Sequence, residues 1–369
     1  MTTVNEKTPD RFGKANLTMS EPSTPLSAAP EDSRKNDTDR GTFSLGQRLR
    51  HPRTLISFGL AIAIIVFAVR SLDIDLLETW QYMRSANPWL LGTGLIVFYL
   101  TFPLRALRWR MLLINAGVPV EDGRRSWASF PALIEYIYLS WFANCIVPAK
   151  LGDAYRGYLL KQNGNVSFSA TFGTIFAERL LDMIGLFSLL VLSGLLTFGP
   201  QMPEGTQIVF GFGSLLVIII ISGLIGMRWL GPQIRWFIPR RLHRVYGNFE
   251  HSALTSFAPA ILPRLFVLTA AIWTLEGFRL WFVIQSLDHT GLNLTLAAII
   301  FVALSSSLLT ALPITPAGLG VVEGTITVVL TLFGIAASLG SAVTLLDRLI
   351  NFWSIVIFGF ILYLFSRRK

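Results

Sequence analysis

Residues 144–157 read Asn-Cys-Ile-Val-Pro-Ala-Lys-Leu-Gly-Asp-Ala-Tyr-Arg-Gly. Proline and glycine both interrupt helices, and this stretch carries both of them. It also carries three charged side chains, those of Lys150, Asp153 and Arg156. The sequence around it is mostly hydrocarbon, so the stretch predicts a break in the backbone within an apolar environment.

The stretch has a second copy. Pro148-Ala149-Lys150-Leu151-Gly152 returns later in the chain as Pro316-Ala317-Gly318-Leu319-Gly320. Two flanking blocks repeat in the same order, because Arg108 corresponds to Arg279 and Glu178-Arg179 corresponds to Asp347-Arg348. Three blocks in one order at nearly one spacing predict two related halves, about 88–199 and 264–366.

The composition indicates a polytopic membrane protein. Of 369 residues 52% are hydrophobic and 14% charged, and the mean hydropathy is +0.56. The single cysteine, Cys145, has no partner for an internal disulfide, and the four histidines show no metal-ligand spacing, so we expect no cofactor and no metal. The formal net charge is +9, and the basic residues that produce it lie between apolar runs rather than on one soluble face. It therefore indicates orientation in a membrane, and we expect no nucleic-acid partner.

The polar amino-terminal residues differ from the rest of the chain. Residues 1–46 hold few large apolar groups and predict a disordered tail. No signal peptide is expected, because no short apolar core with a small-residue cleavage site opens the chain. Residues 47–369 predict a single transmembrane domain, whose first span runs from Thr54 to about Val69. Arginines 48, 50 and 53 precede this span, so the tail is predicted to be cytoplasmic.

Apolar runs predict an all-α, polytopic integral membrane protein with about six full spans plus two hairpins. The loop at 199–205 has no basic residue and is predicted outside, whereas the stretch from Arg228 to Arg264 carries six arginines and is predicted inside. Residue 125 is also predicted inside, so the run 127–166 must enter and return, turning at 148–152. This run is either a re-entrant pair of helices or two tight spans.

The second half is predicted to repeat this arrangement upside down. Residues 294–312 enter from the outside, prolines and glycines between 313 and 320 break the run, and 321–337 return. A last span, about 341–365, descends to a cytoplasmic carboxyl terminus. The halves are therefore predicted to be inverted repeats, as in many secondary transporters. Broken backbone at bilayer depth must be satisfied by protein or by a water-filled cavity, so the two breaks predict a polar cavity near the midplane.

The first break carries charges that favour a role in binding. A charge at bilayer depth costs ~2.5–3.5 kcal/mol even on insertion scales. Lys150 and Arg156 are therefore predicted to attract an anionic group. Asp153 is equally well explained as their counter-ion, and an Asp153–Arg156 pair that only holds the helix is the simpler alternative.

A second charged group lies in the other half. Glu276 and Arg279 fall in the middle of the apolar run 265–287, where their spacing allows either a salt bridge or a place in a cavity. Glu323 is predicted to receive a proton or a cationic group, or to pair with an arginine of the other half. The predicted substrate-binding residues are Lys150, Asp153, Arg156, Glu276, Arg279 and Glu323.

Other residues are predicted to support this site. Arg108 is placed at a cytoplasmic helix end where its side chain reaches water, and Asn144 is expected to cap free backbone N–H groups. Glu178 and Asp182 are either interfacial charges or part of the site. Trp141 and Trp273 are expected to face lipid or to lie at the membrane interface. The supporting set is Arg108, Asn144, Pro148, Gly152, Glu178, Arg179, Asp182, Pro316, Gly318, Gly320, Asp347 and Arg348.

These motifs together resemble a known family. The pattern Arg105-x-x-Arg108-Trp109, Asn144-x-x-x-Pro148-x-Lys150-x-Gly152-Asp153-x-x-Arg156, Glu178-Arg179-x-x-Asp182 and Pro313-x-x-Pro316-x-Gly318-x-Gly320-x-x-Glu323 is similar to the transmembrane region of lysylphosphatidylglycerol synthases, over about residues 54–366. The resemblance implies movement of a lipid with a charged head group between leaflets. Stand-alone relatives are associated with aminoacylated phospholipid, hopanoid or polyprenyl-phosphate sugar pathways. Lys150 and Asp153 stand where the family pattern has Arg and Glu, which keeps the charge but changes the geometry.

The sequence therefore predicts a lipid flippase or translocase of the cytoplasmic (inner) membrane, with both termini cytoplasmic and membrane lipids as partners. No catalytic motif is present, and the chain ends at Lys369 without an aminoacyl-transfer domain, so we expect no enzyme activity. The alternatives are a membrane-embedded transferase or its accessory subunit, acting on polyprenyl-phosphate or phospholipid substrates, and a scaffold for a separate lipid synthase. The sequence also allows an oligomer.

Overall fold

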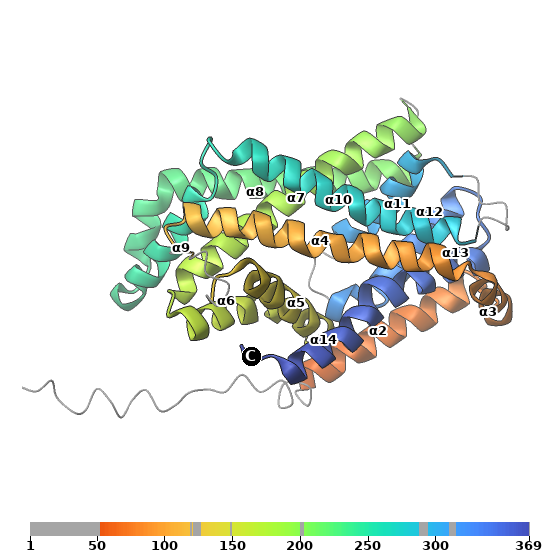
Figure 1. Cartoon of the computed structure of the whole chain (residues 1–369). Helices are drawn as coiled ribbons and strands as arrows, with labels where there is room; N and C mark the ends of the chain where they lie inside the picture. The colour runs from red at the N-terminus through yellow and green to blue at the C-terminus, as the bar shows by residue number, and fades with distance from the viewer. Residues whose placement is uncertain are drawn as a thin grey trace, which may run out of the picture. The chain divides into compact units, whose positions relative to one another are not determined.

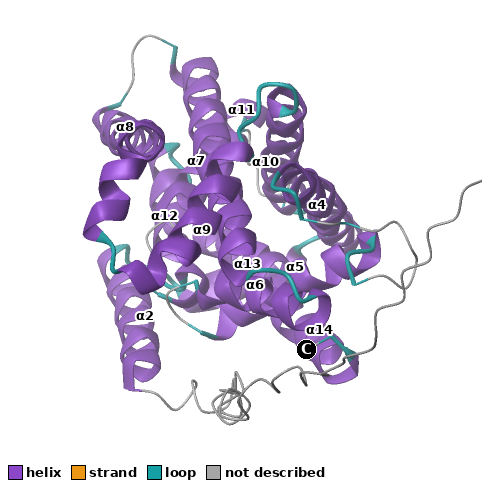
Figure 2. Ribbon diagram, turned by 90° about the vertical axis from the view of Figure 1, so that its left-hand side faces the viewer, coloured by secondary structure: helices purple, strands orange, loops and turns teal. Residues whose placement is uncertain are grey.

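A computed structural model describes residues 52–118, 120, 127–147, 150–199, 203–287, 294–309 and 315–368. These residues belong to one unit, Leu45–Lys369. The predicted disordered tail, 1–46, lies outside the described residues, and so does Pro148. All elements in the described ranges are helices, joined by short loops (Figure 2), which confirms the predicted all-α class.

The first half contains two long helices with a broken hairpin between them. After α2 (Pro52–Ser71) and the short α3 (Leu76–Ser85) comes α4 (Pro88–Asn115), and the half ends with α7 (Phe168–Phe198). Between these, α5 (Phe130–Ile146) and α6 (Leu151–Gly164) form the hairpin. Side chains fix several of these starts: Asp75 accepts from backbone N–H groups at the start of α3, Asn87 does so at α4 and Ser167 at α7.

The second half has the same order of elements. The long α8 (Glu204–Phe237) and the short α9 (His243–Thr255) lead to α10 (Leu262–Gln285). A second hairpin follows, α11 (Leu296–Leu309) and α12 (Val321–Leu332), with the 3-10 turn η4 (Pro316–Gly318) between its arms. The last long helix consists of α13 (Ala337–Arg348), a π-helical turn η5 (Leu349–Trp353) and α14 (Ser354–Phe365).

Many contacts between two helices have a counterpart between the equivalent helices of the other half, as two-fold symmetry requires. The central helices α4 and α10 lie side by side (Figures 1 and 2). Around them α5 packs on α14 as α11 packs on α7, and α6 packs on α7 as α12 packs on α13. The short helix α3 packs on α13 as α9 packs on α7, so the correspondence extends N-terminal of 88 and 264. The contact pattern is that of two repeats around a pseudo-two-fold axis.

Five described helices are long and apolar enough to cross a membrane by length and composition: Pro88–Asn115, Phe168–Phe198, Gly205–Gly231, Leu262–Gln285 and Ala337–Phe365. The first predicted span corresponds to α2, whose part from Gly59 to Ser71 is apolar but shorter. The hairpin arms have 17 and 14 residues in the first half and 14 and 12 in the second. All four are below the ~20 residues that a full span needs. The hairpins are therefore broken helices, as predicted.

Candidate functional site

The first hairpin turns sharply at Lys150. This residue precedes α6 with left-handed backbone angles, φ 54° and ψ 33°. The side chain of Asn144 closes the turn, because its Oδ1 accepts a hydrogen bond from the backbone N–H of Gly152 at 2.8 Å. A Cβ atom on Gly152 would lie only 2.0 Å from the carbonyl oxygen of Ser140, so the arms are in backbone contact there. The predicted capping role of Asn144 is confirmed.

The second hairpin is held by an arginine of α13. Ala317, Gly318 and Gly320 have φ of 47°, 70° and 82°, so no regular helix continues through this turn. Arg348 Nη2 donates to the carbonyl oxygens of Ala317 at 3.3 Å and Gly318 at 3.1 Å. Its Nε donates to Glu323 Oε1 at 2.8 Å, and Glu323 Oε2 accepts from the N–H of Gly320 at 2.6 Å. The ion pair thus satisfies backbone groups that the broken helix leaves open.

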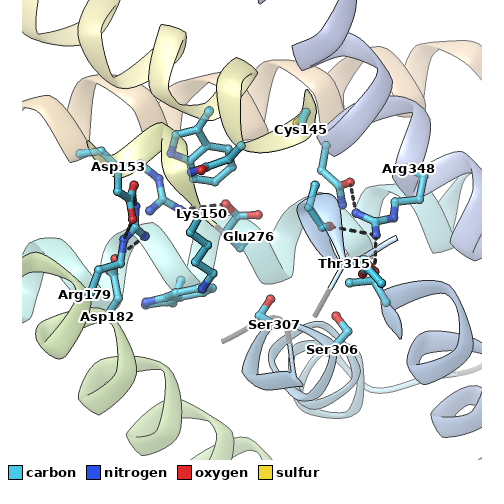
Figure 3. A pocket seen from close by; sticks show the side chains of 18 of the residues that line it. Cys145, Lys150, Asp153, Arg179, Asp182, Glu276, Ser306, Ser307, Thr315 and Arg348 are labelled. Atoms are coloured by element: carbon cyan, nitrogen blue, oxygen red, sulfur yellow. Dashed lines mark hydrogen bonds and ion pairs between the residues drawn. The ribbon is translucent and has the colours of Figure 1, made fainter. Parts of the chain in front are cut away.

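A cavity of about 220 Å³ lies between the two breaks and is lined by both hairpins together with α4, α7, α10 and α13. This is well above the ~10–15 Å³ that a cavity needs to hold one water. Figure 3 shows Lys150 extending between two groups: Asp153, Arg179 and Asp182 on one side, and Thr315 and Arg348 on the other. The predicted polar cavity is therefore present between the hairpins.

Six charges on the first-half side, all buried except the partly exposed Arg179, form one network, which we call the first-half cluster: Arg108, Arg156, Arg179, Asp153, Glu178 and Asp182. Arg108 donates from Nη1 to Asp182 at 2.6 Å and from Nη2 to Glu178 at 3.1 Å, and Arg156 donates to Glu178 at 2.7 Å. Arg179 donates to both oxygens of Asp153, at 2.8 and 2.9 Å, and to Asp182 at 3.4 Å. Three positive and three negative charges balance here.

The second-half cluster is built in the same way from Arg105, Arg279, Arg348, Glu276, Asp347 and Glu323. Arg279 makes a two-pronged pair with Asp347, at 2.8 and 3.1 Å, and contacts Glu276 at 2.5 Å. Asn351 Nδ2 donates to Asp347 at 2.7 Å, and Arg348 completes the cluster through Glu323. These three positive and three negative charges also balance.

Arg105 and Glu276 join the halves, since Arg105 Nη2 donates to Glu276 Oε1 at 3.0 Å. The sequence separation of these two residues equals the separation between Arg108 and Arg279. Equivalent positions of the two repeats therefore contact each other, as residues on a two-fold axis do. The Arg105 guanidinium also lies over the rings of Trp141 and Trp273, 4.7 and 5.9 Å from their centroids.

Lys150 differs from the other charges of the cavity. It lines the cavity half-buried, and it has no ion pair or hydrogen bond in the described part of the chain. The twelve charges of the two clusters are each paired. The site as a whole therefore carries one positive charge more than it carries negative charges.

The structure divides the predicted binding residues. Lys150, Asp153, Glu276 and Arg279 line the cavity, whereas Arg156 and Glu323 lie behind it. Arg156 is only 1% exposed and stacks on Trp109 with its guanidinium 4.5 Å from the ring centroid. Asp153 pairs with Arg179 and not with Arg156, and Glu323 pairs with Arg348 of its own half. The Glu276–Arg279 salt bridge is confirmed.

The predicted supporting residues divide in the same way. Those that line the cavity are Asn144, Arg179, Asp182, Gly318 and Arg348, and those that lie behind it are Arg108, Gly152, Glu178, Gly320 and Asp347. Pro148 lies outside the described residues, and Pro316 begins the turn η4.

Two predictions about individual side chains were wrong. Arg108 was expected to reach water at a helix end, but α4 continues to Asn115 and the Arg108 side chain is fully buried between acidic partners. Trp141 and Trp273 were expected to face lipid or the membrane interface, but they line the cavity and cover Arg105. The signal for Arg105 was available in the sequence, since it stands opposite Glu276 in the repeat alignment.

Fold and site together define a multi-pass helical membrane protein with a charged cavity between two broken hairpins. The model of one family, the lysylphosphatidylglycerol synthase TM region, matches residues 54–359, and the chain belongs to that family. A UPF0104 membrane protein of Methanocaldococcus jannaschii is 39% identical over 228 residues, 62% of this chain and 95% of that protein. A UPF0104 membrane protein of Methanothermobacter thermautotrophicus is 24% identical over 84% of this chain and 92% of its own length.

A third relative carries a name that refers to an activity. The glycosyltransferase AglD of Haloferax volcanii is 25% identical over 310 residues, which are 75% of this chain. The match covers 48% of AglD, so this chain corresponds to about half of that protein.

Proposed function

We propose that the protein translocates a lipid with a phosphate-bearing head group across the cytoplasmic membrane. The observation that carries this proposal is the unpaired Lys150 ammonium in a polar cavity between two broken hairpins. A charged head group that crosses hydrocarbon alone faces a cost of ~2.5–3.5 kcal/mol or more per charge. A cavity with an available cation and hydroxyl groups lowers that cost, while the acyl chains stay in the lipid.

The repeat architecture supports movement rather than static binding. Two equivalent halves around one cavity allow the same site to open toward either face in turn, which is the usual use of inverted repeats. In this proposal both termini are cytoplasmic, and the connection between α7 and α8 faces outward. Transport is downhill, or coupled to an ion or to the membrane potential.

A membrane-embedded transferase, or the accessory subunit of one, is the second candidate. It is favoured by the glycosyltransferase name of AglD, a relative that matches three quarters of this chain. In this case the cavity would hold a polyprenyl-phosphate or phospholipid substrate during group transfer without moving it to the other leaflet.

Reconstitution in liposomes tests both candidates. Fluorescent lipids of several head groups are added, and dithionite bleaches those in the outer leaflet. If the protein translocates the lipid, dithionite bleaches more than half of the label, because lipids from the inner leaflet reach the outer leaflet. Lys150→Met should reduce the rate of this bleaching at least tenfold. Lys161→Met, at an exposed position of the same helix α6, should not reduce it. Wild-type protein that moves none of the phosphate-bearing lipids would refute the proposal, and a new lipid product formed without movement would favour the transferase.

A further inference from the structure

The charged groups in and around the cavity are almost all paired with one another. Each cluster contains three arginines and three carboxylates, and all twelve groups are held by ion pairs of 2.5 to 3.4 Å. Arginine keeps its proton in proteins, so the arginine charges do not adjust to a ligand. Lys150 is the one remaining cation of the site within the described residues, and it leaves a net charge of one.

The repeat does not cancel or double this charge. The position equivalent to Lys150 in the second half is occupied by Gly318. Gly318 also lines the cavity, so the second hairpin contributes backbone where the first contributes an ammonium group. Arginines also line the cavity, but each of them is ion-paired, so Lys150 is the one unpaired cation that a ligand meets among the described residues.

Three hydroxyl side chains also line the cavity. Ser306, Ser307 and Thr315 come from the second hairpin (Figure 3). Thr315 is 5% exposed, and its hydroxyl has no hydrogen-bond partner in the described part of the chain. Buried hydroxyl groups without partners are uncommon, because the lost hydrogen bond to water is costly. Ser306 and Ser307 donate to the carbonyl oxygen of Ala303, at 2.8 and 2.9 Å, whereas the Thr315 hydroxyl can donate to a ligand oxygen without changing the charge.

We propose, building on the proposed function, that the cavity selects lipids whose head group bears one net negative charge. Such a head group is a phosphodiester that carries no further charged substituent. Such a group neutralises Lys150 and leaves no excess. An aminoacylated phosphodiester with a lysyl group adds two ammonium charges and leaves the cavity with more positive charge than before. A phosphate monoester carries about −1.5 to −2 at neutral pH and leaves an excess of negative charge.

Equilibrium binding tests the charge rule separately from transport. The purified protein in a neutral detergent is loaded with phosphatidylglycerol that carries a dansyl-labelled acyl chain, and tryptophan-to-dansyl transfer is measured because Trp141 and Trp273 line the site. Unlabelled lipids then compete. We expect phosphatidylglycerol to displace the probe at least tenfold better than phosphatidylcholine, phosphatidic acid or lysylphosphatidylglycerol. Equal competition by lysylphosphatidylglycerol would overturn the rule.

Variants at Lys150 make the test specific. Lys150→Arg should keep the order of preference, Lys150→Gln should lose the tenfold advantage of phosphatidylglycerol over phosphatidylcholine, and Lys150→Glu should reverse the order in favour of lysylphosphatidylglycerol. A reversed order also proves that the variant is folded. Lys161→Gln is the matched control, exposed on the same helix, and should behave as wild type. A Lys150→Glu protein that still prefers phosphatidylglycerol would overturn the rule.

Two further arms separate the sources of the anion and the two proposals. Dimethyl phosphate has the same charge without acyl chains, and if it competes as well as phosphatidylglycerol the occupant is a free anion and the lipid assignment fails. Protein that binds lipids in the expected order but moves none refutes the translocase and leaves the charge rule standing. Protein that moves all head groups at one rate and binds them equally refutes the charge rule alone.

Discussion

Replacing Arg108 by methionine should be among the most destabilising single changes in the membrane domain. The Arg108 side chain is fully buried and donates to Asp182, Glu178 and Thr269, at 2.6, 3.1 and 2.8 Å. Methionine keeps much of the volume but leaves the first-half cluster with two cations and three carboxylates. Removing one partner of a buried ion pair costs about 3–5 kcal/mol, because the remaining charge stays buried. We expect a loss of that size in the free energy of unfolding.

A second substitution tests whether charge balance is the cause. Asp182 retains only Arg179, at 3.4 Å, once Arg108 is gone. Asp182→Asn in the Arg108→Met background restores two cations and two carboxylates, and should recover about 0.5–3 kcal/mol, the usual range for coupled sites. Taken alone, Asp182→Asn should destabilise. The double variant is therefore expected to be more stable than Arg108→Met.

Unfolding by sodium dodecyl sulfate in mixed micelles measures these differences. Tryptophan fluorescence reports the cluster, because Trp109 stacks on Arg156 and donates to Thr174 at 3.2 Å. The control is Arg84→Met at an exposed position of α3, for which we expect at most about 1 kcal/mol. The reasoning fails if Arg108→Met loses no more stability than this control, or if the losses of the two cluster variants simply add.

Three other predictions concern the hairpins and the orientation. Gly152→Ala should lower the stability of the protein by about 3 kcal/mol, since the added Cβ would meet the Ser140 carbonyl oxygen. Gly92→Ala is the control: its Cβ would have nothing within 4 Å, and the substitution should raise the stability by up to about 1 kcal/mol. Thermal unfolding of the two variants measures the difference. Arg348→Lys should loosen the second turn, because one ammonium cannot reach both Glu323 and two carbonyl oxygens. A cysteine placed at the buried Thr315, in a Cys145→Ser background, should then react faster with maleimide than it does when Arg348 is intact. An equal rate of reaction would contradict this prediction. In intact cells, cysteines introduced at Glu204 and Thr290 should react with an impermeant reagent and one at Arg240 should not, and labelling at 240 would reverse the orientation.

The course of the backbone could be predicted from the sequence. Apolar runs, prolines and glycines have local effects, so the long helices α4, α7 and α10 and the break at Lys150 were found close to their positions. The end of α4 was missed because the apolar run stops near Leu107, whereas the helix continues to Asn115. A polar helical segment buried by neighbouring helices looks in sequence like a segment that has reached water. This error placed Arg108 at the surface.

The pairing of the charges could not be predicted in the same way. Spacing along one helix suggested the Glu276–Arg279 pair, and it was found. Arg108 instead reaches Asp182 and Glu178, which lie far along the chain on another helix, α7. Spacing also allowed Arg156 to pair with Asp153 on its own helix, but Arg156 pairs with the carboxylate of Glu178 on α7. Which of several opposite charges is nearest depends on how helices pack, and the sequence pattern does not contain that information.

The contact between Arg105 and Glu276 shows why the two halves cannot be identical. Because these positions are equivalent and touch, identical halves would bring two arginines or two glutamates together in a buried site. Either pair of like charges is strongly unfavourable there, so opposite charges at this position are the simplest solution for a duplicated fold. Lys150 and Gly318 differ in the same sense, one offering a cation and the other backbone. The symmetric scaffold thus supplies the two broken hairpins. The differences at equivalent positions give the cavity its net charge and make its two sides chemically different.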